Sequence, residues 1–117
     1  MTFEADLTTV LKTVRPKVFP DVAPVGTTGD YLVYQGAGGQ SLRYVENTPA
    51  DKRNTLMQVA SWAFDRETSL AMARAVEEAL CASDLFTASP QSEPISSHEP
   101  ETKRYGCTQR FSIYSAR

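Results

Sequence analysis

The feature that most constrains the fold of this 117-residue chain is a change of apolar period at Asp65. Before it, the segment 56–64 reads LMQVASWAF, which is largely apolar on both faces of an extended chain. After it, four apolar residues recur at the spacing of one helical face: Leu70, Ala73, Val76 and Leu80. Asp65 itself is a favoured N-cap residue. The sequence therefore predicts a buried strand that passes directly into a helix folded back over the same sheet.

The two apolar faces of the segment 56–64 predict a central strand, because strands covered on both sides lose the simple polar alternation. We expect helices on one face and another cover on the opposite face, such as a neighbouring subunit. The helix after Asp65 also carries a row of small side chains, Ala71, Ala75 and Ala79. We expect this row to allow close packing of the helix on the sheet.

Four other segments complete the predicted order of elements. Residues 3–14 have apolar side chains at helical spacing, and Pro16 ends that helix. The segments 31–35 (YLVYQ) and 41–47 (SLRYVEN) have the composition of strands. Residues 105–115 (YGCTQRFSIYS) alternate between apolar and polar side chains, which predicts a last strand that closes the sheet.

The glycine-rich stretch GAGG at 36–39 has two readings. A phosphate-binding loop would place such glycines between a strand and a helix, with a following Lys or a helix N-terminus to balance the charge. Here the glycines lie between two predicted strands and no Lys follows them. We therefore interpret GAGG as the tight turn of a hairpin.

The segment 87–104 is the most polar part of the chain. It contains three prolines and several serines and glutamates, with Ile95 as its only large aliphatic side chain. Such a segment buries too little surface to offset the entropy lost on ordering. We predict a mobile polar loop at about 87–104.

Together these segments predict one α+β domain over residues 1–117. Its element order is α-β-β-β-α-β, with an approximately four-stranded, mixed or mostly antiparallel sheet and two helices on one face. A chain of this length forms one modest core.

Composition and motifs argue against several classes of function. The net charge is −2 and no basic stripe is visible, so nucleic-acid binding is not expected. No apolar run is long enough to span a membrane. The single histidine, His98, lies in the predicted loop without a partner to orient it, and no residues have zinc-ligand spacing. We therefore expect no enzyme activity, no metal and no cofactor.

The two cysteines and two aromatic residues leave alternatives open. Cys81 and Cys107 are read as free thiols of a cytosolic protein, with a bridge between a helix end and a strand as the alternative. Trp62 and Phe64 either pack in the core or form a subunit contact, because aromatic residues are common in both settings. The sequence does not separate these readings.

The order of these parts resembles the small tail completion, or tail terminator, family of long-tailed bacteriophages and prophages. The likeness extends from the first helix to about Leu85. It is carried by matching positions in the segment VFPDVAPVGTTGDY, in the strand before Asp65 and in the helix after it. These positions are Val18, Phe19, Ala23, Pro24, Gly26, Tyr31, Gln58, Trp62, Ala71, Ala75, Val76 and Leu80.

The resemblance implies a structural protein that ends elongation of the tail tube. Such a protein is monomeric in isolation, assembles on the tube as a ring, usually a hexamer, and forms the surface that joins tail to head. The implied partners are the tail tube protein and the head–tail connector proteins. The implied location is the host bacterial cytoplasm during assembly and then the virion tail. The candidate subunit or tube contacts are Gln58, Trp62, Phe64, Ile95 and His98.

Two other functions fit the sequence less closely. A head–tail connector, or neck adaptor, would have a similar size and ring symmetry. A small cytosolic binding module would instead place a ligand pocket beneath the helices and would not respond to tail tubes.

Overall fold

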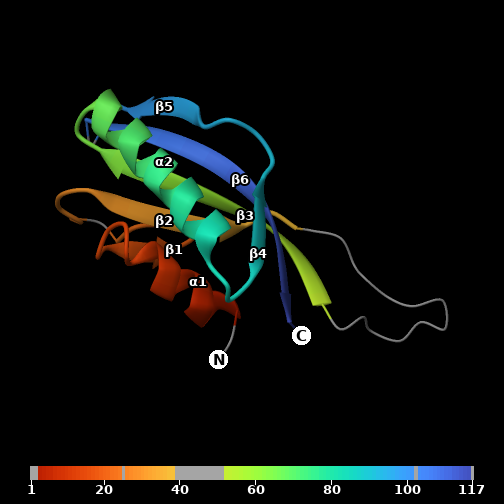
Figure 1. Ribbon diagram of the computed structural model, residues 1–117. Helices are drawn as coiled ribbons and strands as arrows, with labels where there is room; N and C mark the ends of the chain where they lie inside the picture. Colours follow the sequence, from red (N-terminus) through yellow and green to blue (C-terminus); the bar gives the residue numbers. More distant parts are fainter. Residues whose placement is uncertain (1–2, 25, 39–51, 102, 117) are drawn as a thin grey trace.

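The computed structural model describes residues 3–24, 26–38, 52–101 and 103–116, and Figure 1 shows the arrangement of the elements. The helices are α1 (Phe3–Leu11) and α2 (Arg66–Ala82). The strands are β1 (Val18–Pro20), β2 (Tyr31–Gly36), β3 (Lys52–Ala63), β4 (Thr87–Pro90), β5 (Ile95–Glu99) and β6 (Arg104–Ala116). The predicted α+β class is confirmed, with a mixed sheet of six strands where the sequence predicts about four.

The strands form one sheet in the order β1-β2-β3-β6-β4, and β5 pairs with β6 beside β4. β1 is parallel to β2, whereas the other pairings are antiparallel. The predicted central strand is confirmed, because β3 pairs with β2 on one side and with β6 on the other. β6 is equally central, since the edge strands β4 and β5 both pair with it.

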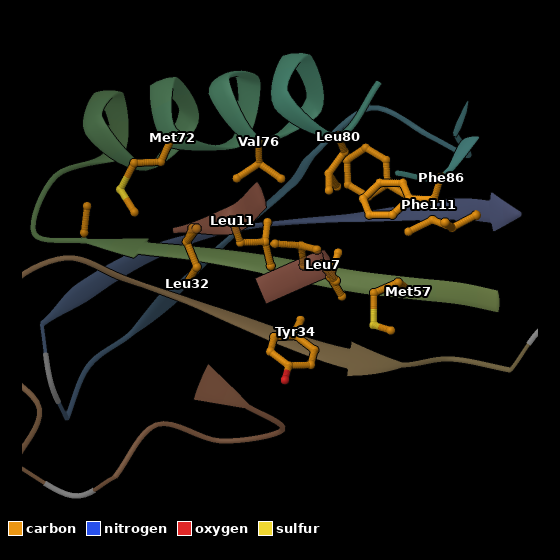
Figure 2. Packing of buried hydrophobic residues seen from close by; sticks show 13 residues of the cluster. Leu7, Leu11, Leu32, Tyr34, Met57, Met72, Val76, Leu80, Phe86 and Phe111 are labelled. Atoms are coloured by element: carbon orange, nitrogen blue, oxygen red, sulfur yellow. The ribbon is translucent and has the colours of Figure 1, made fainter. Parts of the chain in front are cut away.

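The core lies between the helices and one face of the sheet. Both helices contribute to a single apolar cluster with side chains from β2, β3 and β6, as Figure 2 shows from close by. The fully buried members include Leu7 and Leu11 of α1, Leu80 of α2, and Phe111 and Ile113 of β6. The alternation of side chains along the strands places this cluster on one face only. The opposite face of the sheet, here called the open face, carries no helix among the described residues.

The junction at Asp65 follows the prediction closely. The Asp65 carboxylate accepts a hydrogen bond of 2.7 Å from the backbone N–H of Thr68, which is N-cap geometry. The hydrogen bonds from Thr68 hold the pKa of the Asp65 carboxyl below its ordinary value. The capped end directs α2 back over the strand that precedes it.

The buried face of α2 differs in part from the prediction. Ala73, Val76 and Leu80 are buried as expected, together with Ser69 and Met72. Leu70 is 40% exposed, because it lies about 100° around the helix axis from Ser69. The prediction for the alanine row is wrong, since Ala71 and Ala75 are exposed and only Ala79 is half-buried.

The partner of β2 also differs from the prediction. β2 pairs with β3 in the register Tyr31↔Trp62, and its other side is occupied by β1. The chain does not turn back at Gly36, because the Ala37 N–H donates to the Leu56 carbonyl and the Leu56 N–H donates to the Gly38 carbonyl. A tight turn over 36–39 is therefore wrong for residues 36–38. The predicted strand 41–47 lies outside the described residues.

The polar segment 87–104 contains two strands, so the prediction that it forms a loop is wrong for residues 87–90 and 95–99. β4 pairs with residues 111–114 of β6, and β5 pairs with residues 104–108. Between them, the Gln91 N–H donates to the Arg110 carbonyl at 2.8 Å. Backbone hydrogen bonds to the edge of β6 compensate for the ordering that apolar burial could not offset. The mobility of the segment stays a prediction.

Candidate functional site

The open face of the sheet gathers the side chains that point away from the helices. Its register pairs include Tyr31 with Trp62 and Gln58 with Arg110. Most of its side chains on β3 are half-buried, whereas Met57, Val59, Ser61 and Ala63 on the helix side of β3 are buried. The sequence predicts a cover on this second face, and its side chains on β3 are instead partly exposed to solvent. The exposed part of these side chains is available for contact with another molecule.

At one end of the open face a buried cation is stacked between two aromatic rings. Arg104 is only 5% exposed. Its guanidinium carbon lies 4.9 Å from the centre of the Tyr31 ring and 4.7 Å from the centre of the Phe64 ring. Both distances are within the range of cation–π attraction. Phe64 itself is 56% exposed, so its outer face stays open to contact.

The same guanidinium holds the loop that follows β1. Nη2 of Arg104 donates to the carbonyls of Thr27 at 2.8 Å and Gly29 at 3.1 Å, while its Nε is buried without a partner among the described residues. Lys17 donates to the carbonyl and hydroxyl of Thr28. The loop is thus fixed against the sheet by basic side chains that bind its backbone.

Trp62 lies flat against β6, directly opposite Gly106. A Cβ atom at position 106 would lie 2.8 Å from Cζ3 of the Trp62 ring, closer than carbon atoms can approach. Glycine is therefore required here by a close approach of the ring to the strand. The indole occupies the space that a side chain at position 106 would fill.

These groups line a cleft of about 630 Å³ between the loop after β1 and the open face. Its walls include the rings of Tyr31, Trp62 and Phe64. Its charged lining residues are the acidic Asp21, Glu99 and Glu101 and the basic Arg104. Since the guanidinium is nearly buried, the accessible charge of the cleft is negative. The cleft combines aromatic walls with an acidic rim.

The Tyr31 phenol is a protonated donor at neutral pH. Burial raises its pKa, the Arg104 cation lowers it and the Glu99 carboxylate raises it again, with a net upward shift. Tyr31 is 6% exposed and lines the cleft. A protonated phenol in this wall is a hydrogen-bond donor to a molecule that enters the cleft.

The structure brings most of the sequence-predicted contact residues to the open face. Trp62 and Phe64 line the cleft, and Gln58 accepts a hydrogen bond of 3.3 Å from Nε of Arg110 further along the sheet. Ile95, on β5, is 67% exposed and shares this face through its pairing with Thr108. His98 is separate, because its ring stacks on Tyr105 at 4.5 Å, on the helix side of the register.

Sequence reasoning missed Arg104, Glu99 and Glu101. All three belong to the segment read as a mobile loop or to its border, where no fixed geometry is expected. The one signal in the sequence was the predicted strand 105–115. Extended back by one residue, its alternation places residue 104 on the same face as Gly106. The pairing of Glu99 with Arg104 then follows only once β5 is known.

The remaining reactive groups lie apart from this cleft. Cys81 and Cys107 are free thiols, so the alternative of a bridge between them does not hold. Sγ of Cys107 lies 3.5 Å from the Ser69 hydroxyl in the core, while burial and the Glu77 carboxylate raise the pKa of Cys81.

Within the described ranges, no group of three or more His, Cys, Asp or Glu side chains has the arrangement of a metal site. No helix in these ranges is long and apolar enough to cross a membrane.

Comparison with known proteins assigns no family to this chain. No protein-family model matches it, and no curated protein matches it either. Similar chains occur among solved structures. One is a crystal structure from Akkermansia muciniphila, with 12% sequence identity and a TM-score of 0.46. The match includes 96% of this chain but only 46% of that chain, so this protein spans about half of its length.

Proposed function

We propose that this protein is a tail terminator: it assembles as a ring on the end of a phage or prophage tail tube, stops elongation and presents the surface to which the head attaches. The observation that carries the proposal is the open face of the sheet. Half-covered apolar and aromatic side chains there, including Trp62 and Phe64, provide a surface for protein contacts. Gln58 and Trp62, two positions of the family resemblance, both belong to this face.

A ring of this kind requires a head-to-tail contact that closes on itself. The exposed apolar side chains on this face are scattered, as Phe64 and Ile95 illustrate, which is compatible with a soluble monomer before assembly. Contact with the tube end would raise the local concentration of monomers and favour closure of a hexamer. The acting location is the host bacterial cytoplasm and then the assembled tail.

Two alternatives remain as outcomes of the test. A head–tail connector would use the same face but would bind tails that already carry a terminator. A small binding module is favoured by one specific observation, the 630 Å³ cleft, which lies on the open face instead of beneath the helices. A module of that kind would bind its ligand without any effect on tails.

The test is a tail-assembly experiment in which the gene is deleted and the purified protein is added back. The proposal expects tubes of irregular length without the protein, caps at tube ends by electron microscopy after addition, and a monomer by analytical ultracentrifugation before it. Ile95→Ser should weaken capping, because Ile95 is exposed on the open face. Leu85→Ser is the matched control, since Leu85 is 47% exposed beyond the end of α2. Normal tails in the deletion strain and bare tube ends after addition would refute the proposal.

A further inference from the structure

The acidic, aromatic cleft on the open face calls for an occupant with a defined chemistry. Its rim carries the carboxylates of Asp21, Glu99 and Glu101, while its one basic lining residue, Arg104, is 5% exposed. The Arg104 guanidinium stacks on Tyr31 and Phe64 and donates to two backbone carbonyls. An incoming group therefore meets negative charge at the rim and rings in the walls. Charge complementarity favours a cation.

A second, independent observation concerns hydrogen-bond donors in the cleft wall. Tyr31 is 6% exposed, and its phenol lines this wall. Nε of Arg104 is buried without an acceptor among the described residues. A buried donor without an acceptor is unfavourable, so an occupant that supplies an acceptor to Nε of Arg104 is favoured. A simple amine offers a cation but no acceptor.

We propose that the cleft binds a segment of a partner protein that presents an arginine or lysine side chain. The basic group pairs with the rim carboxylates of Asp21 and Glu101. Its aliphatic stem lies against the rings of Trp62 and Phe64, and a backbone carbonyl next to it accepts a hydrogen bond from Nε of Arg104. A peptide segment is the occupant that supplies all three features together. The inference deepens the proposed function, on which it rests for the existence of protein partners.

Trp62 makes the cleft directly observable, because it is the only tryptophan in the chain and it lines the wall. The probe is the capped peptide acetyl-Leu-Arg-Leu-amide, titrated against the full-length protein with tryptophan fluorescence and amide NMR shifts as readouts. The matched peptide contains citrulline instead of arginine, which keeps the shape and removes the charge. Saturable binding of the arginine peptide, at least several-fold tighter than the citrulline peptide, is the expected result.

Two variants then localise the contact. Glu101→Gln removes one carboxylate from the rim and should weaken binding of the arginine peptide roughly threefold to fivefold, as expected for a partly exposed ion pair. Glu78→Gln makes the same change of charge on the exposed surface of α2, away from the cleft, and should leave binding unchanged. Equal binding of the two peptides, no binding up to millimolar concentration, or equal weakening by the two variants would each overturn the proposal.

Two further arms distinguish the peptide site from a site for small cations and from the capping activity itself. Free argininamide that binds as tightly as the peptide would overturn the protein-segment proposal and indicate a small organic cation instead. Capping of tube ends by the wild-type protein is measured in parallel. Capping without peptide binding overturns this inference alone, while peptide binding without capping overturns only the proposed function.

Discussion

Gly106→Ala is the substitution for which the structure gives the most direct estimate of a change in stability. The added methyl carbon would lie 2.8 Å from Cζ3 of Trp62 and 2.9 Å from Cε3 and Cη2 of the same ring. Ordinary carbon contacts are about 3.5–4.0 Å, so the indole must move by roughly 1 Å. Overpacking of this size costs about 1–3 kcal/mol. The loss of unfolded-state entropy offsets about 0.4–1 kcal/mol, which leaves a net loss of about 1–2 kcal/mol.

The assay is thermal unfolding followed by circular dichroism, with the emission of Trp62 as a local probe. A loss of this size should lower the midpoint of thermal unfolding by roughly 3–8 °C in a domain of this length. Gly36→Ala is the matched control, because no atom lies within 4 Å of the Cβ that it would add in β2. We expect that control to be neutral or slightly stabilising, by at most about 1 kcal/mol.

A double-mutant cycle decides whether the ring is the cause. Trp62→Ala removes the group with which the methyl would collide, so Gly106→Ala should lose most of its effect in that background. A coupling of about 1–2 kcal/mol between the two positions is expected. If Gly106→Ala unfolds like the wild type and leaves the tryptophan emission unchanged, the close approach of Trp62 to β6 is not present in solution.

Three other predictions test the remaining parts of the fold. Leu80→Ala should lower the free energy of unfolding by about 2–5 kcal/mol, whereas Leu70→Ala should change it by less than about 0.5 kcal/mol, because only Leu80 is buried. Equal losses of the two variants in chemical denaturation would contradict the assigned buried face of α2. Asp65→Asn should reduce stability at pH values above 3.8, the ordinary pKa of the carboxyl, and should match the wild type in more acidic solution. Folding lowers the pKa of Asp65, so the carboxylate stabilises the folded state above the pKa of the unfolded chain, and this stabilisation is lost as the pH falls through the pKa of the folded protein. A difference that persists in denaturation at low pH would argue against this role of the N-cap carboxylate. The backbone amide of Gln91 should exchange slowly with deuterium, since it donates a hydrogen bond to the Arg110 carbonyl of β6. Exchange at the rate of an unstructured peptide would instead support a mobile loop in this segment.

The local elements of this protein were predictable where a single periodic signal dominates. The boundary at Asp65 followed from a change of period and an N-cap residue, and the structure places the cap and the helix there. The last strand followed from strict alternation, which the structure confirms over Arg104–Ala116. Such signals arise from interactions between residues close in sequence, which the sequence contains in full.

The pairing of strands and the composition of the cleft depend on interactions between distant parts of the chain. The polar segment 87–104 has no apolar pattern of its own, and its strands exist because the edge of β6 supplies hydrogen-bond partners. Leu70 has the large apolar side chain that is typical of a core residue, yet the orientation of α2 on the sheet leaves this side chain 40% exposed.

The sequence by itself determined the α+β class, the position of the central strand and the cap of the helix that follows it. Only the tertiary structure decided that Arg104 stacks between Tyr31 and Phe64 and that Glu99 and Glu101 form the rim of the same cleft. The physical reason is the range of the forces involved. Capping and periodicity act within a few residues, whereas a shared cleft requires strand register, and register is set by the packing of the whole sheet.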